Sequence, residues 1–186
     1  MGAGVIPLAV QDGEVFFLFQ KTFSGRKMGC LIDFGGGVGA GENYRTTAVR
    51  EFVEETETMY LDDSPGTPHR SDSRITSQIT QVEEIFERTL SAHPHWWRQR
   101  KSPNPMKPKD WRTYFIEFPY VDVFVLNREW KSDTGGRFKK RRELVWVSAE
   151  ALLDIYTRKP SALWKRVRQL EDAETLIGDI RSSLLG

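Results

Sequence analysis

The alternation of hydrophobic and polar residues predicts several short strands. Residues 4–10 and 15–19 are β-branched and aromatic runs, and Asp12-Gly13 lies between them, so a strand, a tight turn and a second strand are expected. Residues 30–34 predict another short strand that ends at the triple glycine, Gly35–Gly37. Further strands are expected at 111–118, 121–126 and 144–147, with Pro119 as a break between the first two of these.

Helices are predicted where apolar residues recur three or four positions apart. Residues 43–58 form one such segment, with Ala48, Val49, Phe52 and Val53 on a single stripe. A second helix is expected near 76–92, and a short one begins after Ser148, which caps it. A last helix is expected from Pro160 or Ser161, with these residues on its buried face: Leu163, Trp164, Val167, Leu170, Leu176, Ile177 and Ile180.

Two polar segments predict loops. Residues 61–75 are rich in Pro, Ser and Asp, and residues 94–111 are basic and Pro-rich, which is typical of an exposed loop. Around them, strands and helices interleave without a regular βαβ rhythm. This order favours an α+β fold in which helices sandwich a sheet over a doubly wound fold.

Composition narrows the class of protein. The chain has 186 residues, which predicts one domain with an insertion or a tail, and its net charge of +1 gives no global signal for nucleic acid or membrane. Cys30 is the one cysteine, so no intrachain disulfide can form, and a reducing, cytoplasmic compartment is expected. No apolar run approaches the roughly 20 residues that span a bilayer.

A cluster of glutamates stands out on the helix predicted at 43–58. Glu51, Glu54 and Glu55 fall largely opposite the apolar stripe, so their carboxylates converge on one patch. Like charges at such spacings destabilise a helix by roughly 0.2–0.5 kcal/mol per pair. Arg45 and Arg50 are the only cations in the helix and cannot neutralise the whole patch. A divalent cation such as Mg²⁺, which takes carboxylate and phosphate oxygens, would remove the repulsion.

The glycines beside this helix add a second chemical feature. Glycine lets the backbone approach a ligand closely, and a helix N-terminus favours anions such as phosphate. Carboxylates suited to a metal, next to backbone suited to phosphate, indicate phosphoryl or pyrophosphate chemistry. The alternative for such a charge run is a solvated helix face.

The spacing of these residues resembles the Nudix box. Gly36 is followed by five residues and Glu42, and seven more residues lead to Arg50-Glu51, Phe52, Val53 and Glu54-Glu55. The resemblance covers about 23 residues, from Gly36 to Thr58, with every charged position present. Glu57 stands where the family usually has a second glycine, and Thr58 where it usually has an aliphatic residue. Both departures lie at the helix C-terminus, where glycine commonly serves as a cap.

The resemblance implies a Nudix fold, an α/β/α sandwich with a mixed β-sheet. It also implies a single Nudix domain over 1–186, with a helical and basic insertion at about 61–110 and a C-terminal helix at about 160–184. The implied activity is hydrolysis of a pyrophosphate bond in a nucleoside diphosphate derivative, with Mg²⁺ or Mn²⁺. The metal ligands implied are Glu51, Glu54, Glu55 and the Gly35 carbonyl, and Glu51 is a ligand or the general base. Arg50 orients the carboxylates, and Glu42 is its partner or an outer ligand.

Substrate contacts are expected outside the box. The loop before the glycines would bring Lys21, Arg26 or Lys27 to phosphates. Glu143 and Glu117 are candidates for a further carboxylate ligand or base. Trp96 and Trp97 lie beside cations and would suit stacking on bases, or else would pack the insertion onto the core. Residues 135–143 carry five cations, which would steer an anionic substrate or form a plain charged turn.

Three functions remain open at this point. The first is a hydrolase acting on a nucleotide-type small molecule, and the second is a Nudix-fold nucleotide- or RNA-binding regulatory module without turnover. The third is an enzyme acting on RNA ends, for which the basic insertion is the only support. A homodimer is compatible with the sequence, since the last amphipathic helix would cover either its own sheet or a partner.

Overall fold

The computed structural model describes residues 1–62, 71–107 and 110–186. Its strands are β1 (Gly2–Gln11), β2 (Glu14–Lys21), β3 (Phe34–Gly37), β4 (Trp97–Gln99), β5 (Trp111–Glu117) and β6 (Glu143–Ser148). Its helices are α1 (Tyr44–Glu55), α2 (Asp72–Ala92), α3 (Phe124–Lys131), α4 (Ala149–Arg158), η1 (Pro160–Ala162), α5 (Lys165–Arg168) and α6 (Ala173–Leu185). Most of the loop predicted at 61–75 lies outside the described residues.

The strands form one mixed sheet in the order β4-β5-β1-β2-β6, and β3 also pairs with β1. Strands β1 and β5 are parallel, whereas the other pairs are antiparallel. The hairpin predicted between β1 and β2 is confirmed. Asp12 and Gly13 both have positive φ, 50° and 77°, as a two-residue turn between twisted strands requires.

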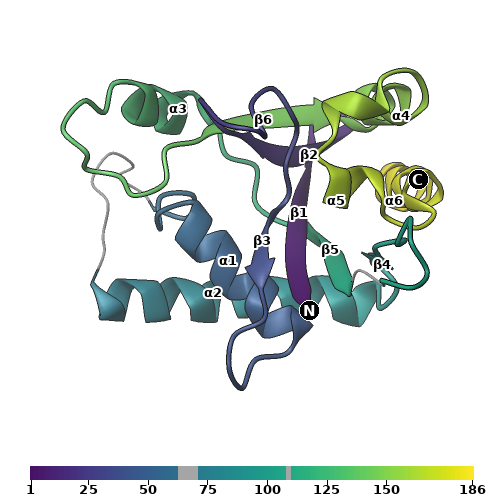
Figure 1. The fold of residues 1–186 in the computed structure, drawn as a ribbon, viewed down its shortest axis with the longest axis horizontal. Coiled ribbons are helices and arrows are strands. Elements are labelled where there is room, and N and C mark those ends of the chain that lie inside the picture. Colours follow the sequence, from purple (N-terminus) through teal and green to yellow (C-terminus); the bar gives the residue numbers. More distant parts are fainter. Residues whose placement is uncertain (63–70, 108–109) are drawn as a thin grey trace.

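Helices cover both faces of the sheet, which confirms the predicted α+β fold, an α/β/α sandwich with a mixed sheet (Figure 1). Alternation along the strands supplies the two cores: Leu18 packs with α1, α2 and α3, whereas its neighbours Phe17 and Phe19 pack with α4, α5 and α6. Among the described residues, no helix is both long and apolar enough to cross a membrane.

The strand predicted at 121–126 is wrong. Residues 124–131 form helix α3 instead, in which Leu126 and Trp130 are buried one turn apart while Phe124 is exposed. The β-branched run Val121–Val125 misled the prediction, because burial at an i, i+4 spacing outweighs strand propensity here.

The strand predicted at 30–34 is displaced along the chain. Leu31 and Ile32 make only isolated bridges, and β3 begins at Phe34 and includes the triple glycine. Gly35 pairs with Gly4 and Gly37 with Gly2, so two glycine-rich backbones lie side by side. Side chains from other elements fill the space that these glycines leave: the Trp111 ring lies against Gly2 and Gly35.

The continuous helix predicted from residue 160 is broken into η1, α5 and α6. Asp172 has a φ of 47°, a left-handed conformation that no helix interior accepts, and it starts α6 afresh. The predicted buried face is nevertheless correct at Leu163, Val167, Leu170, Leu176, Ile177 and Ile180, whereas Trp164 is half-buried.

Two boundaries in the predicted insertion also change. Helix α2 begins at Asp72, capped by Ser71, rather than near residue 76. The basic segment predicted as an exposed loop contains the short edge strand β4, and Trp96 beside it is buried against the α4–α6 core. Trp96 therefore packs the insertion onto the sheet, and Trp97 stacks with the guanidinium of Arg112, 4.0 Å from its ring centroid.

Phe52 links α1 to the sheet, and its replacement tests this core. Its ring lies 5.1 Å from that of Phe34, 5.5 Å from Tyr60 and 4.6 Å from Phe118. We expect Phe52→Ala to lower the free energy of unfolding by about 3–5 kcal/mol, because it leaves a cavity. The control Phe124→Ala, at a 65% exposed position, should change it by less than about 0.5 kcal/mol. Equal losses in urea denaturation would contradict this assignment of the core.

Candidate active site

Helix α1 presents the predicted carboxylates to strand β3. The Asn43 side chain accepts a hydrogen bond from the Thr46 N–H, and Thr46 accepts one from the Asn43 N–H, which fixes the start of the helix where the sequence predicts it. Two of the glutamates do not lie on the outer face as expected. Glu51 and Glu55 are buried against the glycine strand, while the Glu54 side chain remains 41% exposed.

Arg50 joins three of the carboxylates. Its Nε donates to Glu42 at 2.7 Å, and its Nη1 donates to Glu51 at 2.8 Å and to Glu54 at 3.1 Å. Its Nη2 donates to the Gly37 carbonyl at 3.2 Å and so ties the helix to β3. These bonds raise the pKa of Arg50, Glu42 contributing most, so the guanidinium stays charged and orients the acidic groups.

Glu42 accepts hydrogen bonds at both carboxylate oxygens. Besides Arg50, the Gly39 N–H donates to Oε2 at 2.9 Å and the Thr47 hydroxyl donates at 2.8 Å. The Arg50 guanidinium is the largest of the influences that lower the pKa of Glu42, to about 2. Glu42 is thus placed as the partner of Arg50, as the sequence predicts.

Glu51 occupies a space that only glycine leaves open. A Cβ at Gly36 would overlap the Glu51 carboxylate, whereas a Cβ at Gly37 would meet nothing within 4 Å. The missing side chain at Gly36 is therefore what lets this carboxylate lie directly on the β3 backbone.

Glu55 is held beside the same strand. Its Oε2 accepts from the Gly35 N–H at 2.9 Å and from the Gln20 amide at 2.6 Å. Arg142 lies 3.8 Å from its other oxygen. Burial raises the pKa of Glu55 and outweighs the opposing effects of Arg166 and Arg142.

The Gly35 carbonyl, a predicted metal ligand, accepts a hydrogen bond from Arg166 Nη2 at 3.1 Å. Arg166 also pairs with the fully buried carboxylate of Asp33, donates to the Asp33 carbonyl at 3.0 Å and stacks on the Trp111 ring at 4.4 Å. Sequence analysis missed Arg166, Asp33 and Gln20. No spacing could have found Arg166, because it lies 131 residues from Gly35 and reaches it only through the tertiary fold.

The donor set suits a hard divalent cation, since every predicted ligand offers oxygen. Glu51 and Glu55 contact adjacent residues of β3, and Arg50 bridges Glu51 to Glu54. Within residues 1–62, 71–107 and 110–186, however, no three His, Cys, Asp or Glu side chains are already grouped as metal ligands. Arg50 and Arg166 instead hold the acidic groups and the Gly35 carbonyl.

Three of the residues predicted to contact substrate differ in placement. Lys27 is half-buried, and burial, together with the nearby Arg166 and Arg142, lowers its pKa; Glu55 lies close enough to oppose this. Arg26 is exposed on the same loop. Glu143 is exposed at the start of β6, paired in register with Lys21. Lys27 thus lies within the electrostatic reach of Glu55.

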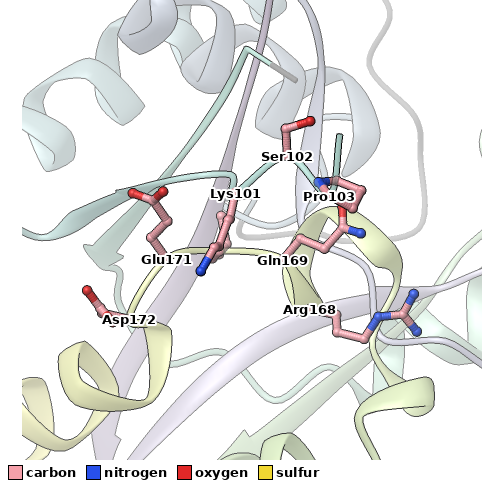
Figure 2. Close-up of a pocket in the computed structure, with 8 residues that line it drawn as sticks. Lys101, Ser102, Pro103, Arg168, Gln169, Glu171 and Asp172 are labelled. Carbon is pink, nitrogen blue, oxygen red and sulfur yellow. The ribbon is translucent and has the colours of Figure 1, made fainter. Parts of the chain in front are cut away.

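A cavity of about 780 Å³ lies elsewhere, between the insertion and the α5–α6 connection (Figure 2). Its walls are Lys101, Ser102 and Pro103 on one side and residues 168–172 on the other. None of the predicted site residues lines it. Two smaller hollows, of about 460 and 340 Å³, do adjoin the acidic cluster, through Glu54 and Arg142 respectively.

Comparison with solved structures identifies the architecture. The chain superposes on the binary complex of C. elegans Ap4A hydrolase with a TM-score of 0.52 and 13% identity, covering 99% of this chain and 98% of that one. The chain has the Nudix fold. A NUDIX hydrolase from Alicyclobacillus acidocaldarius is similar at a TM-score of 0.44 and 14% identity, covering 97% of this chain and 90% of that one.

Comparisons of the sequence with protein-family models and with curated proteins find no match. Glu57, which stands where the Nudix pattern usually has glycine, lies in a C-terminal capping motif at the end of α1. The Glu57 N–H donates to the Glu54 carbonyl and the Thr58 N–H to the Val53 carbonyl, the pair of bonds of a Schellman motif. Glu57 takes the left-handed position, with φ 52°, that glycine usually fills in such a motif.

The lowered pKa of Glu42 predicts an acid-dependent loss of stability. Because its folded pKa lies below its unfolded value, its contribution is present above about pH 4.5 and is lost as the pH falls toward 2. Glu42→Gln should lower the free energy of unfolding by on the order of 2 kcal/mol at pH 6. In urea denaturation, the difference from the unmodified protein should shrink steadily between pH 5 and about 2.5. A difference independent of pH would show that the Arg50–Glu42 pair does not contribute in this way.

Proposed function

We propose that the protein hydrolyses a pyrophosphate bond in a nucleoside diphosphate derivative, with Mg²⁺ or Mn²⁺ as cofactor. The observation that carries the proposal is the joint placement of the acidic groups. Glu51 and Glu55 lie against Gly36 and Gly35, and Arg50 links Glu51 to Glu54. A plain solvated helix face, the alternative for this charge run, would not bury two of its glutamates against a glycine strand.

The chain's own residues would hold the cofactor. Glu51, Glu54 and Glu55 offer carboxylate oxygens, and Gly35 offers its carbonyl. Arg166 already donates to that carbonyl, whose second lone pair would be available to a bound ion. Arg50 and Glu42 fix the orientation of Glu51 and Glu54 through charged hydrogen bonds.

A bound divalent ion supplies neutralisation of the phosphate charge and activation of water. Glu51 serves as a further ligand or accepts the proton of the attacking water, since its carboxylate is fixed on β3 beside the other acidic groups. Lys27 and Arg142, both close to Glu55, attract the anionic substrate toward this patch.

A binding module without turnover is the second candidate. The observation that favours it is that cationic side chains hold the predicted ligands: Arg50 holds Glu51 and Glu54, and Arg166 holds the Gly35 carbonyl. Such a module would need no metal, because these guanidinium groups already bind the acidic groups and the carbonyl.

Glu54→Gln tests the hydrolase. The substrate panel contains ATP, ADP-ribose, NADH and Ap4A, the last because a solved protein of this fold is an Ap4A hydrolase. We expect one substrate to turn over with Mg²⁺ or Mn²⁺, and Glu54→Gln to lower kcat/KM at least about 100-fold, because it removes a charged metal ligand. Glu84→Gln, an exposed position on α2, is the matched control and should keep full activity.

The hydrolase proposal would be wrong if no substrate of the panel turned over and if the unmodified protein and Glu54→Gln bound Mn²⁺ equally poorly. These two results would favour the binding module. Equal loss of activity in Glu84→Gln would show that the effect is not specific to the acidic patch.

A further inference from the structure

The basic loop between α3 and β6, residues 132–142, is folded onto the protein. The Asp133 carboxylate accepts from the backbone N–H groups of Arg137 and Phe138, each at 3.1 Å. Phe138 is buried against Trp130, and Arg141 Nε donates to the Trp130 carbonyl at 2.9 Å. A plain charged turn would not need these interior contacts, so the loop presents its cations from a fixed position.

The loop forms one wall of a pocket of about 340 Å³. Thr22, Phe23 and Ser24 line the other wall, and residues 138–142 complete it with four consecutive cations. Two buried polar atoms belong to this lining, Thr22 Oγ1 and Arg142 Nε, and neither has a hydrogen-bond partner among the described residues. Buried polar atoms are almost always paired, so these two leave hydrogen-bonding capacity unused beside the pocket wall.

The same loop borders the acidic cluster. Lys139 and Lys140 also line the hollow of about 460 Å³ that contains Glu54 and Glu57, and Arg142 lies 3.8 Å from Glu55. The cationic pocket therefore adjoins the carboxylates, with the two lysines shared between the hollows. An anion that reaches Glu54 from this side passes Lys139 and Lys140.

Glu57 anchors the loop at this junction. It stands in the left-handed position of the Schellman motif, where a side chain is strained and glycine is favoured. Its Oε1 accepts from the Lys140 N–H at 2.7 Å. Strain that persists because a side chain is needed elsewhere is typical of functional sites, and here that side chain holds the backbone at Lys140.

We propose that this pocket binds a phosphate group beyond the pyrophosphate bond that is cleaved. The substrate is then a nucleotide with three or more phosphates, such as a nucleoside triphosphate or a dinucleoside polyphosphate. A nucleotide sugar carries only two phosphates and would offer none to Lys139, Lys140 and Arg141, whereas Arg142 already lies beside Glu55. This assignment of substrate class rests on the proposed hydrolase function, whereas the binding of phosphate at the pocket does not.

Binding of inorganic tripolyphosphate, compared with inorganic pyrophosphate, tests the pocket without turnover. In isothermal titration calorimetry with EDTA present, tripolyphosphate should bind the unmodified protein at least about 10-fold more tightly. The Lys139→Ala/Lys140→Ala double variant should lose at least about 10-fold in tripolyphosphate affinity. Lys159→Ala removes an exposed lysine after α4, under the opposite face of the sheet, and should bind as the unmodified protein does.

Glu57→Gly tests whether phosphate binding depends on the fixed position of the loop or only on the charge of its lysines. Glycine suits the backbone at this position, so we expect the melting temperature to stay within a few degrees, while tripolyphosphate affinity falls several-fold because Lys140 loses its anchor. The proposal that this pocket binds phosphate would be wrong if tripolyphosphate and pyrophosphate bound with equal affinity. It would also be wrong if the double variant bound tripolyphosphate as the unmodified protein does.

Kinetics then distinguish this proposal from the hydrolase itself. The double variant should lower kcat/KM for ATP or Ap4A by a larger factor than for ADP-ribose, whose two phosphates do not fill the pocket. Turnover that falls equally on all substrates, or on none, would overturn the assigned substrate class and leave the hydrolase intact. If no nucleotide is hydrolysed, the hydrolase proposal fails, and tripolyphosphate binding still decides the pocket.

Discussion

The acidic cluster depends on one guanidinium. Arg50 contacts Glu42, Glu51 and Glu54, and through the Gly37 carbonyl it also ties α1 to β3. Without it, Glu51 and Glu54, three residues apart on α1, would repel each other, and Glu51 would be left buried without a charged partner. The position of α1 on the sheet and the orientation of the proposed ligands thus follow from the same set of hydrogen bonds.

Charges from distant parts of the chain complete the site. Arg166 from α5 holds the loop at Asp33 and Gly35, and Arg142 from the α3–β6 loop approaches Glu55. Breaking a buried pair such as Arg166–Asp33 typically costs about 3–5 kcal/mol, because it leaves an uncompensated charge. The C-terminal segment, which covers the far face of the sheet, therefore also supports the glycine strand on which the carboxylates lie.

Periodicity and local chemistry predicted most of the fold, because the β1–β2 hairpin, α1 and the buried face of the C-terminal segment each follow from short-range patterns. The prediction from these patterns failed at 121–126, where tertiary burial of Leu126 and Trp130 selects a helix for a β-branched run. The box spacing located the glutamates that the structure brings to β3. It could not reveal Arg166 or the anchoring of Lys140 by Glu57, since both join segments far apart in the sequence.

The central claim is that the carboxylates form a metal site because they lie on the glycine strand. Mn²⁺ binding by two glycine variants is the most direct test of this claim. A side chain at Gly36 displaces Glu51, whereas one at Gly37 meets nothing within 4 Å. Titration followed by electron paramagnetic resonance should show bound Mn²⁺ in the unmodified protein and in Gly37→Ala. Gly36→Ala should bind it at least about 10-fold more weakly. Equal binding by the two variants, or none by the unmodified protein, would contradict the account.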